Sequence, residues 1–286
     1  MTIWTFFIVL SRLGARDQMG PYDLALLRFA FAALAVAPVV LARRSGARFG
    51  TLTARRAAVL AAFGGLGFTG FAFAGFARAP AAHAAVLMPG TLPFSTALIA
   101  YLVLGERVSA RRAAGLAAIL AGVALMAWQA LAHDGAQTWR GDLMFPLAAM
   151  CWAVFTVLAR KWGVDPVDAT LAVPVFALAL YLPLYCLLAE PGLAQVPWRT
   201  IVATGVFQGV IALVVSMWAF SRAVAVLGPV KTTMVTALAP AAAAILAVPL
   251  LGESLTLPVV LGLAAVSAGM VIGVGSGAGR DGGDSR

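Results

Sequence analysis

The sequence predicts an all-α polytopic membrane protein, and three observations support this fold class. The 286 residues are 62% hydrophobic and only 11% charged, whereas a soluble domain has about 25% charged residues. The apolar residues form long runs, several of them as long as the roughly 20 residues that a spanning helix needs. These runs are continuously apolar and do not alternate, which favours helices over the strands of a membrane barrel.

Taken in order, the runs predict ten transmembrane helices. The first segment, "MTIWTFFIVLSRLG" at residues 1–14, covers only about 20 Å of the roughly 30 Å of hydrocarbon, so we expect a first helix truncated at its N-terminus. A polar, glycine-rich flexible tail is expected at 276–286. Between them lie nine further runs, at about 21–42, 57–77, 79–105, 113–132, 143–159, 169–189, 200–221, 232–252 and 254–275.

Four blocks of sequence occur twice in the same order, which predicts a duplicated five-helix unit. The repeats are expected at 1–132 and 141–275. The ordered Trp, Arg, Pro and Glu landmarks make chance similarity between apolar runs a poor explanation. The matched blocks are "WTFFIVLSR" (4–12) with "WAVFTVLAR" (152–160), "GFARA" (75–79) with "AFSRA" (219–223), "PFSTALIAYLVLGE" (93–106) with "PAAAAILAVPLLGE" (240–253), and "AAGLAAILAGVALM" (113–126) with "VVLGLAAVSAGMVI" (259–272).

The two copies are predicted to be inverted relative to each other. Five expected helices separate Glu106 from Glu253, and five is an odd number of crossings, so the two acids lie at opposite membrane faces. Inverted repeats are typical of transporters, which hold the substrate near the midplane between the halves.

Basic residues predict which face is cytoplasmic, because cytoplasmic loops carry an excess of Lys and Arg. With both termini inside, six basic residues fall on the outside: Arg12, Arg16, Arg28, Arg78, Arg140 and Arg199. The other 14 of the 20 fall inside: Arg43, Arg44, Arg48, Arg55, Arg56, Arg107, Arg111, Arg112, Arg160, Lys161, Arg222, Lys231, Arg280 and Arg286. Both termini are therefore expected in the cytoplasm, and membrane topology explains the basic balance better than nucleic-acid binding does.

The doubled unit, with "P…LGE" before an "AAGLAAILAGVALM"-like helix, resembles the EamA-type branch of the drug/metabolite transporter superfamily. The resemblance covers nearly the whole chain. It implies a ten-helix carrier of the inner membrane that exports amino acids or related metabolites by alternating access from a central cavity. The family's first helix usually begins well before the tryptophan that matches Trp4.

Prolines and two basic side chains are candidate elements of the pathway. Pro89, Pro93 and Pro240 lie inside spanning runs, where proline bends a helix, so they are candidate bends of cavity walls or packing kinks. His83 and Lys231 precede Pro93 and Pro240 by ten and nine positions. Both are candidate contacts for a substrate carboxylate, with snorkelling to the interface as the alternative for Lys231.

Further pathway candidates are polar or aromatic. Gln208 lies mid-helix and is a candidate ligand contact or helix-packing amide. Trp152 is deeper than an interfacial belt position and, with other apolar side chains, is expected to line a cavity for apolar or aromatic solutes, although lipid-facing or core positions remain alternatives. The other members named for this cavity are Phe71, Phe73, Met88, Phe155 and Trp218.

The remaining acids and glycines favour structural roles. Glu106 and Glu253 are expected to cap the next helix, and a coupling proton is poorly supported because the apolar runs contain no carboxylate. Gly269, Gly273 and Gly277 predict close helix packing, and they also raise a homodimer as an expectation.

The sequence lacks the motifs of several other classes of protein. Two cysteines and two histidines without a CxxC pair give little support for a zinc site or disulfide framework, and no cofactor is expected. "GLGFTG" at 65–70 fits the dinucleotide pattern but lacks the preceding strand. The alternative is a polytopic membrane enzyme acting on lipid-linked substrates, which would require His, Arg, Asp or Glu clustered on one face. We therefore expect a transporter of a small molecule within the lipid bilayer.

Overall fold

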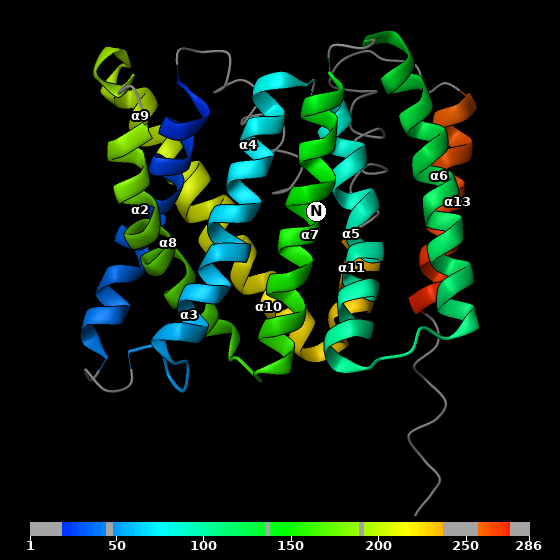
Figure 1. The fold of residues 1–286 in the computed structure, drawn as a ribbon, viewed down its shortest axis with the longest axis horizontal. Helices are drawn as coiled ribbons and strands as arrows, with labels where there is room; N and C mark the ends of the chain where they lie inside the picture. Colours follow the sequence, from blue (N-terminus) through cyan, green and yellow to red (C-terminus); the bar gives the residue numbers. More distant parts are fainter. Residues whose placement is uncertain are drawn as a thin grey trace, which may run out of the picture.

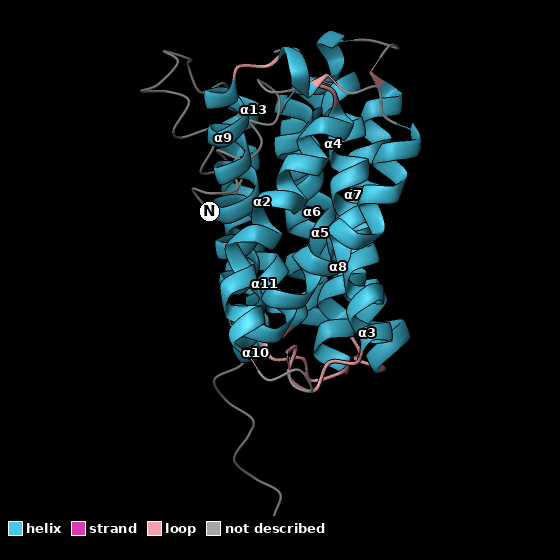
Figure 2. Ribbon diagram, turned by 90° about the vertical axis from the view of Figure 1, so that its left-hand side faces the viewer, coloured by secondary structure: helices cyan, strands magenta, loops and turns pink. Residues whose placement is uncertain are grey.

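The computed structural model describes residues 19–43, 48–79, 81–134, 138–188, 192–236 and 257–274, and this part of the chain is helical without strands. The helices run side by side, with loops at the two ends of the bundle (Figures 1 and 2). They are α2 (Pro21–Ala42), α3 (Ala54–Leu60), η2 (Ala61–Gly67), α4 (Phe68–Arg78), α5 (Ala81–Leu104), α6 (Ala110–Asp134), α7 (Trp139–Lys161), α8 (Pro166–Leu188), η4 (Leu193–Gln195), α9 (Trp198–Gly205), η5 (Val206–Val215), α10 (Ser216–Leu227), α11 (Pro229–Thr236) and α13 (Leu257–Val274).

Six of these helical segments are long and apolar enough to cross a membrane. The α3–η2–α4 and α9–η5–α10 segments each form one continuous rod, Ala54–Arg78 and Trp198–Leu227. Large apolar side chains cover the outside of the bundle, such as Leu34, Leu102 and Leu187, which are 68%, 66% and 80% exposed. An apolar exterior of this kind requires lipid around it, so the prediction of an all-α membrane protein is confirmed. The first expected helix and Pro240 lie outside the described residues.

The loops at one end of the bundle are the ones expected in the cytoplasm. The helices α2, α5, α7 and α10 end at the lower end of Figure 1, and α5, α7 and α9 begin at the upper end. Arg28, however, is part of α2 and is buried, so its assignment to an outside loop was wrong. Its position inside the bundle leaves the excess of basic residues at the lower end unchanged.

Carboxylates also lie within the helices, which corrects the expectation that the helices contain none. Asp23 is in the first turn of α2 and is 3% exposed. Asp142 is in the first turn of α7, which begins four residues earlier than the apolar run suggested. Polar residues in the first turn belong to the helix because their backbone groups make helical hydrogen bonds, although a hydropathy criterion leaves these residues out.

The cap of α6 is Ser109, whose Oγ accepts the amide of Arg112 at 3.3 Å. The expectation that Glu106 provides this cap is therefore wrong. α5 ends at Leu104, and Gly105 follows with φ of +70°, a left-handed conformation that favours glycine, so that the chain turns toward α6. Glu106 in that turn lines a cavity at the lower end together with Lys231.

Glycines allow α6 and α13 to pack with their backbones in contact. A Cβ at Gly269 would lie 2.5 Å from the carbonyl oxygen of Gly115, and one at Gly122 would lie 2.5 Å from that of Gly262. These two helices stand together at the right of Figure 1. The small-residue face that raised a homodimer is thus used within the chain, which is the usual role of such faces in membrane proteins.

The first and second halves of the chain share one core. α2 packs against η5 and α8, and α5 packs against α7. At the lower end, Arg43 after α2 forms an ion pair with Asp168 of α8 at 2.7 Å. At the upper end, the hydroxyl of Tyr185 in α8 donates to Asp23 of α2 at 2.6 Å. Asp23 lies two residues after Pro21, the first residue of α2, and Asp168 lies two residues after Pro166, the first residue of α8. One polar contact is therefore present at each end of this helix pair.

Candidate substrate pathway

Two π-helical segments occur at corresponding places in the two halves. η2 precedes Arg78 and η5 precedes Arg222, and these arginines are matched in the repeated blocks 75–79 and 219–223. π-helical turns inside α-helices widen the backbone and frequently mark functional sites. Both segments lie in the middle of their rods, at the depth where a transport pathway would pass.

A buried arginine connects the two halves at η5. Arg28 is 2% exposed and Gln208 is 1% exposed. The Nη1 atom of Arg28 donates to the Gln208 side-chain oxygen at 3.2 Å, and its Nη2 atom donates to the Ala212 carbonyl at 3.4 Å. A charged group inside a spanning helix is costly, and such residues usually mark a functional site. Sequence reasoning missed Arg28 as a site residue, although an arginine in the middle of an apolar run was the signal for it.

Aromatic rings continue from this arginine across the bundle. The guanidinium carbon of Arg28 lies 6.0 Å from the ring centroid of Phe68. The ring of Trp152 lies 5.0 Å from that of Phe68, 5.1 Å from that of Phe155 and 5.3 Å from that of Phe220. We call Phe68, Trp152, Phe155 and Phe220 the aromatic cluster. It joins α4, α7 and α10, and sequence reasoning had found two of its four members.

The centre of the aromatic cluster contains an unsatisfied donor. Trp152 is 5% exposed, and its indole Nε1 has no hydrogen-bond partner among the described residues. A buried N–H that makes no hydrogen bond costs about 1–3 kcal/mol. A solute that offers an oxygen acceptor at this point would remove that cost, which makes Trp152 a candidate contact for a polar group of the substrate.

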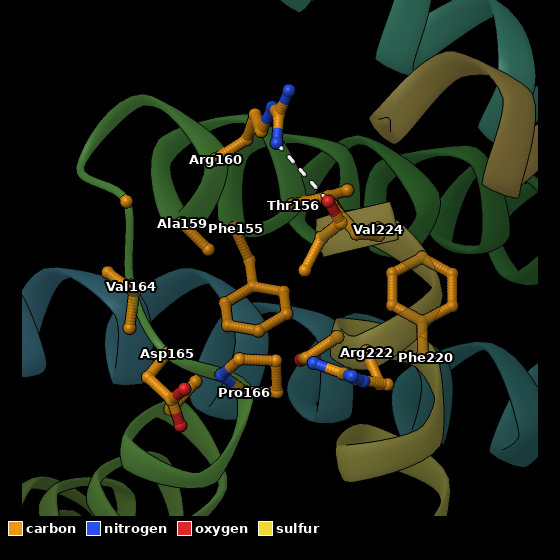
Figure 3. A pocket seen from close by; sticks show the side chains of 14 residues that line it. Phe155, Thr156, Ala159, Arg160, Val164, Asp165, Pro166, Phe220, Arg222 and Val224 are labelled. Atoms are coloured by element: carbon orange, nitrogen blue, oxygen red, sulfur yellow. Dashed lines mark hydrogen bonds between the residues drawn. The ribbon is translucent and has the colours of Figure 1, made fainter. Parts of the chain in front are cut away.

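The aromatic cluster leads to a cavity between α7, α8 and α10. The cavity has a volume of about 310 Å³ and lies at the lower end of the bundle, where Phe155, Arg160, Asp165 and Arg222 line it (Figure 3). Arg160 donates from Nη1 to the carbonyl of Ala225 at 3.4 Å. A second cavity of about 490 Å³ lies between α2, α4 and Tyr181 of α8.

His83 forms a buried pair that the sequence did not predict. It is 1% exposed, and its Nδ1 atom lies 2.7 Å from Oδ1 of Asp142, across the interface of α5 and α7. The hydroxyl of Thr138 donates to the other carboxylate oxygen of Asp142 at 2.9 Å. Asp142 was missed because it directly precedes the apolar run. The pair lies at the upper end, at the starts of both helices.

The other predicted residues are spread over the bundle. Met88 is 1% exposed in the core, whereas Trp218 of α10 is 48% exposed. Lys231 is half-buried at the start of α11 and lines a cavity of about 200 Å³ with Glu106, Arg112 and Arg160. Pro89 and Pro93 lie inside α5, which remains helical through both. The structure therefore brings together Trp152 and Phe155, places Gln208 nearby through Arg28, and keeps His83 and Lys231 at opposite ends.

Comparison with known proteins gives a family and a fold. The family model of the EamA-like transporter family matches residues 1–128 and again residues 139–274. A solved crystal structure matches with a TM-score of 0.70 and 20% sequence identity, covering 95% of this chain and 92% of its own. At that identity the likeness shows a shared fold. No curated protein matches.

Proposed function

Because the chain belongs to the EamA-like transporter family, we propose that it is a secondary transporter that exports small amphipathic metabolites such as amino acids. We propose ten membrane helices arranged as two inverted five-helix repeats, in the inner membrane, with both termini in the cytoplasm. The lower end of Figure 1 is then the cytoplasmic end. The solute would move through a central pathway by alternating access, as the two repeats rock against each other.

The observation that carries this proposal is the contact between Arg28 and Gln208 beside the aromatic cluster. Arg28 comes from the first half of the chain and Gln208 from the second, and both are buried between spanning helices. Polar groups at this depth, next to aromatic rings and an indole N–H without a hydrogen-bond partner among the described residues, suit a solute with an apolar body and a polar head.

The helix arrangement supports an inverted duplication. After the turn at Gly105, α6, α7, α8 and the α9–η5–α10 rod alternate in direction, and α11 then starts from the lower end (Figure 1). Four crossings thus separate the start of α6 from that of α11, and the fifth crossing that the duplication requires would begin with α11. The paired π-helical segments η2 and η5 add a second correspondence between the halves.

The substitution Trp152→Leu is expected to reduce transport at least about tenfold, because it removes the central ring and the indole N–H of the aromatic cluster. Trp198→Leu is the matched control, since Trp198 is 69% exposed at the start of α9. The measurement is efflux from reconstituted vesicles under imposed proton or sodium gradients, across a panel of amino acids and related metabolites. If the efflux of every solute in the panel stayed the same with and without the imposed gradients, a secondary transporter would be contradicted.

Lys231→Ala is expected to abolish transport while the thermal unfolding midpoint stays close to that of the wild type. The amine lies in the cavity that the first half lines with Glu106 and the second with Arg160, where it is positioned for the carboxylate of a solute. Wild-type flux in this variant would assign Lys231 to snorkelling at the interface.

Cysteine labelling tests the proposed orientation. In a protein with Cys151 and Cys186 replaced by alanine, Arg48→Cys is expected to react with an impermeant thiol reagent only from the cytoplasmic side. Gln195→Cys, in the loop at the opposite end, is expected to react only from outside. Both positions are exposed in the structure. The reverse pattern would invert the orientation, and labelling of both from one side would disprove the topology.

A further inference from the structure

The cavity between α7, α8 and α10 contains groups of both charges beside an apolar wall. We propose that it is the cytoplasmic binding site for a zwitterion, a solute that carries a carboxylate and an ammonium group on one end and a small apolar side chain on the other. This inference rests on the proposed transport function and assigns the first binding step of an amino acid to named residues of this cavity.

Arg222 and Ser221 provide the carboxylate half of the site. Arg222 is exposed and lines the cavity, with its guanidinium directed toward Pro166 (Figure 3). A guanidinium binds a carboxylate with two parallel hydrogen bonds, which are roughly twice as strong as neutral ones. The neighbouring hydroxyl of Ser221 is buried and has no hydrogen-bond partner among the described residues. Its O–H is therefore available to donate to the same carboxylate.

Asp165 provides the ammonium half. It lies on the other side of Pro166 from Arg222 (Figure 3). Its Oδ1 atom accepts the backbone amide of Val167 at 2.8 Å, which holds the side chain at the start of α8. The fixed carboxylate can still accept hydrogen bonds from an ammonium group through its other oxygen, since a carboxylate has about four acceptor positions.

The apolar wall fits the rest of such a solute and connects the cavity to the pathway. Phe155 and Phe220 line the cavity together with Val224. Phe155 is 1% exposed, and its ring lies 5.1 Å from that of Trp152. The volume of about 310 Å³ is at the low end of the roughly 300–1,000 Å³ of small-molecule pockets. A small amino acid fits this volume, and its next contact toward the membrane centre would be the aromatic cluster.

The corresponding position in the first half lacks the hydroxyl group of this site. Arg78 is the repeat counterpart of Arg222 and lines the second cavity, but Ala77 stands where Ser221 stands in the second half. Arg78 donates to the carbonyl of Ala74 within its own helix at 3.0 Å. The hydroxyl beside the arginine is thus particular to the cytoplasmic cavity, which favours zwitterion binding at this end over the other.

The test measures binding to the full-length protein in lipid nanodiscs by isothermal titration calorimetry. The probes are L-leucine, 4-methylpentanoate, which lacks its ammonium group, and 3-methylbutylamine, which lacks its carboxylate. The wild type is expected to bind leucine at least about tenfold more tightly than either analogue. Arg222→Gln should lower the affinity for leucine and for 4-methylpentanoate by about tenfold or more. Asp165→Asn should lower the affinity for leucine to that for 4-methylpentanoate, and the affinity for 4-methylpentanoate should stay unchanged.

Ser221→Ala, which removes one oxygen atom and cannot overpack the site, is expected to weaken leucine and 4-methylpentanoate a few-fold. Arg199→Gln is the control for lost charge, because Arg199 is exposed on α9 at the opposite end. Wild-type affinity for leucine in the Arg222 and Asp165 variants would overturn the proposal, as would equal binding of all three probes or no leucine binding by the wild type. Leucine binding with this pattern but no flux in vesicles would refute the transport function and leave the site standing.

Discussion

Replacing Gly269 with alanine is expected to lower the thermal unfolding midpoint by several degrees, through a loss of about 1–3 kcal/mol. The added Cβ would lie 2.5 Å from the carbonyl oxygen of Gly115 and 2.9 Å from the amide nitrogen of Ile119. Both are backbone atoms, which cannot rotate away as a side chain can, so α6 and α13 would have to separate. Separation along a packed interface removes van der Waals contacts that hold helices together in lipid.

The matched control is Gly70→Ala, because Gly70 is also helical and an added Cβ there meets nothing within 4 Å. Alanine has the higher helix propensity, by about 0.8–1 kcal/mol, so Gly70→Ala is expected to be neutral or slightly stabilising. Thermal unfolding of both variants, followed by loss of the monodisperse gel-filtration peak, measures the difference. Equal midpoints for the two variants would show that α6 and α13 do not pack in this way.

Arg28→Leu and Gln208→Leu are each expected to destabilise the protein by about 1.5–3 kcal/mol. Each substitution leaves the partner group buried with fewer hydrogen bonds, Gln208 without the Arg28 donor or Arg28 without the Gln208 side-chain acceptor. Arg28→Lys is expected to fall in the same range, because an ammonium group cannot reach the Gln208 oxygen and the Ala212 carbonyl from two separate nitrogens as the guanidinium does.

A double-mutant cycle tests whether these effects have a common cause. The double variant Arg28→Leu with Gln208→Leu is expected to lose less stability than the sum of the two single variants, because the two polar groups are removed together. Thr69→Val is the control for the loss of a buried polar group outside this pair. Thr69 is equally buried, and its hydroxyl has no hydrogen-bond partner among the residues that the structure describes. Additive losses would show that Arg28 and Gln208 contribute independently.

The fold class could be predicted without tertiary information, because the bilayer itself imposes helical spanning segments. Without water, backbone groups must bond within their own helix, so a long apolar run predicts a spanning segment. The family resemblance is confirmed, and it depended on the order of the repeated blocks, which a linear sequence records directly. The limits of the helices were less accessible, as Asp142 and Ser109 show, since hydropathy does not register a polar first turn or a cap.

The candidate site divides in the same way. Trp152 and Gln208 could be found because a large aromatic or an amide within an apolar run is unusual in itself. Their partners could not, because Phe68 and Arg28 are 84 and 180 positions away along the chain and meet them only through packing. The pairing of His83 with Asp142 has the same origin, in the contact of α5 with α7.

The sequence by itself determined that this protein is a helical membrane protein with a duplicated unit, because composition, run length and repeat order are properties of the linear chain. Only the tertiary structure decided which polar groups share an environment: Arg28 with Gln208, His83 with Asp142, and Arg222 with Asp165 around one cavity. The physical reason is that the cost of a polar group in a membrane depends on its neighbours, and helix packing brings those neighbours from distant parts of the chain.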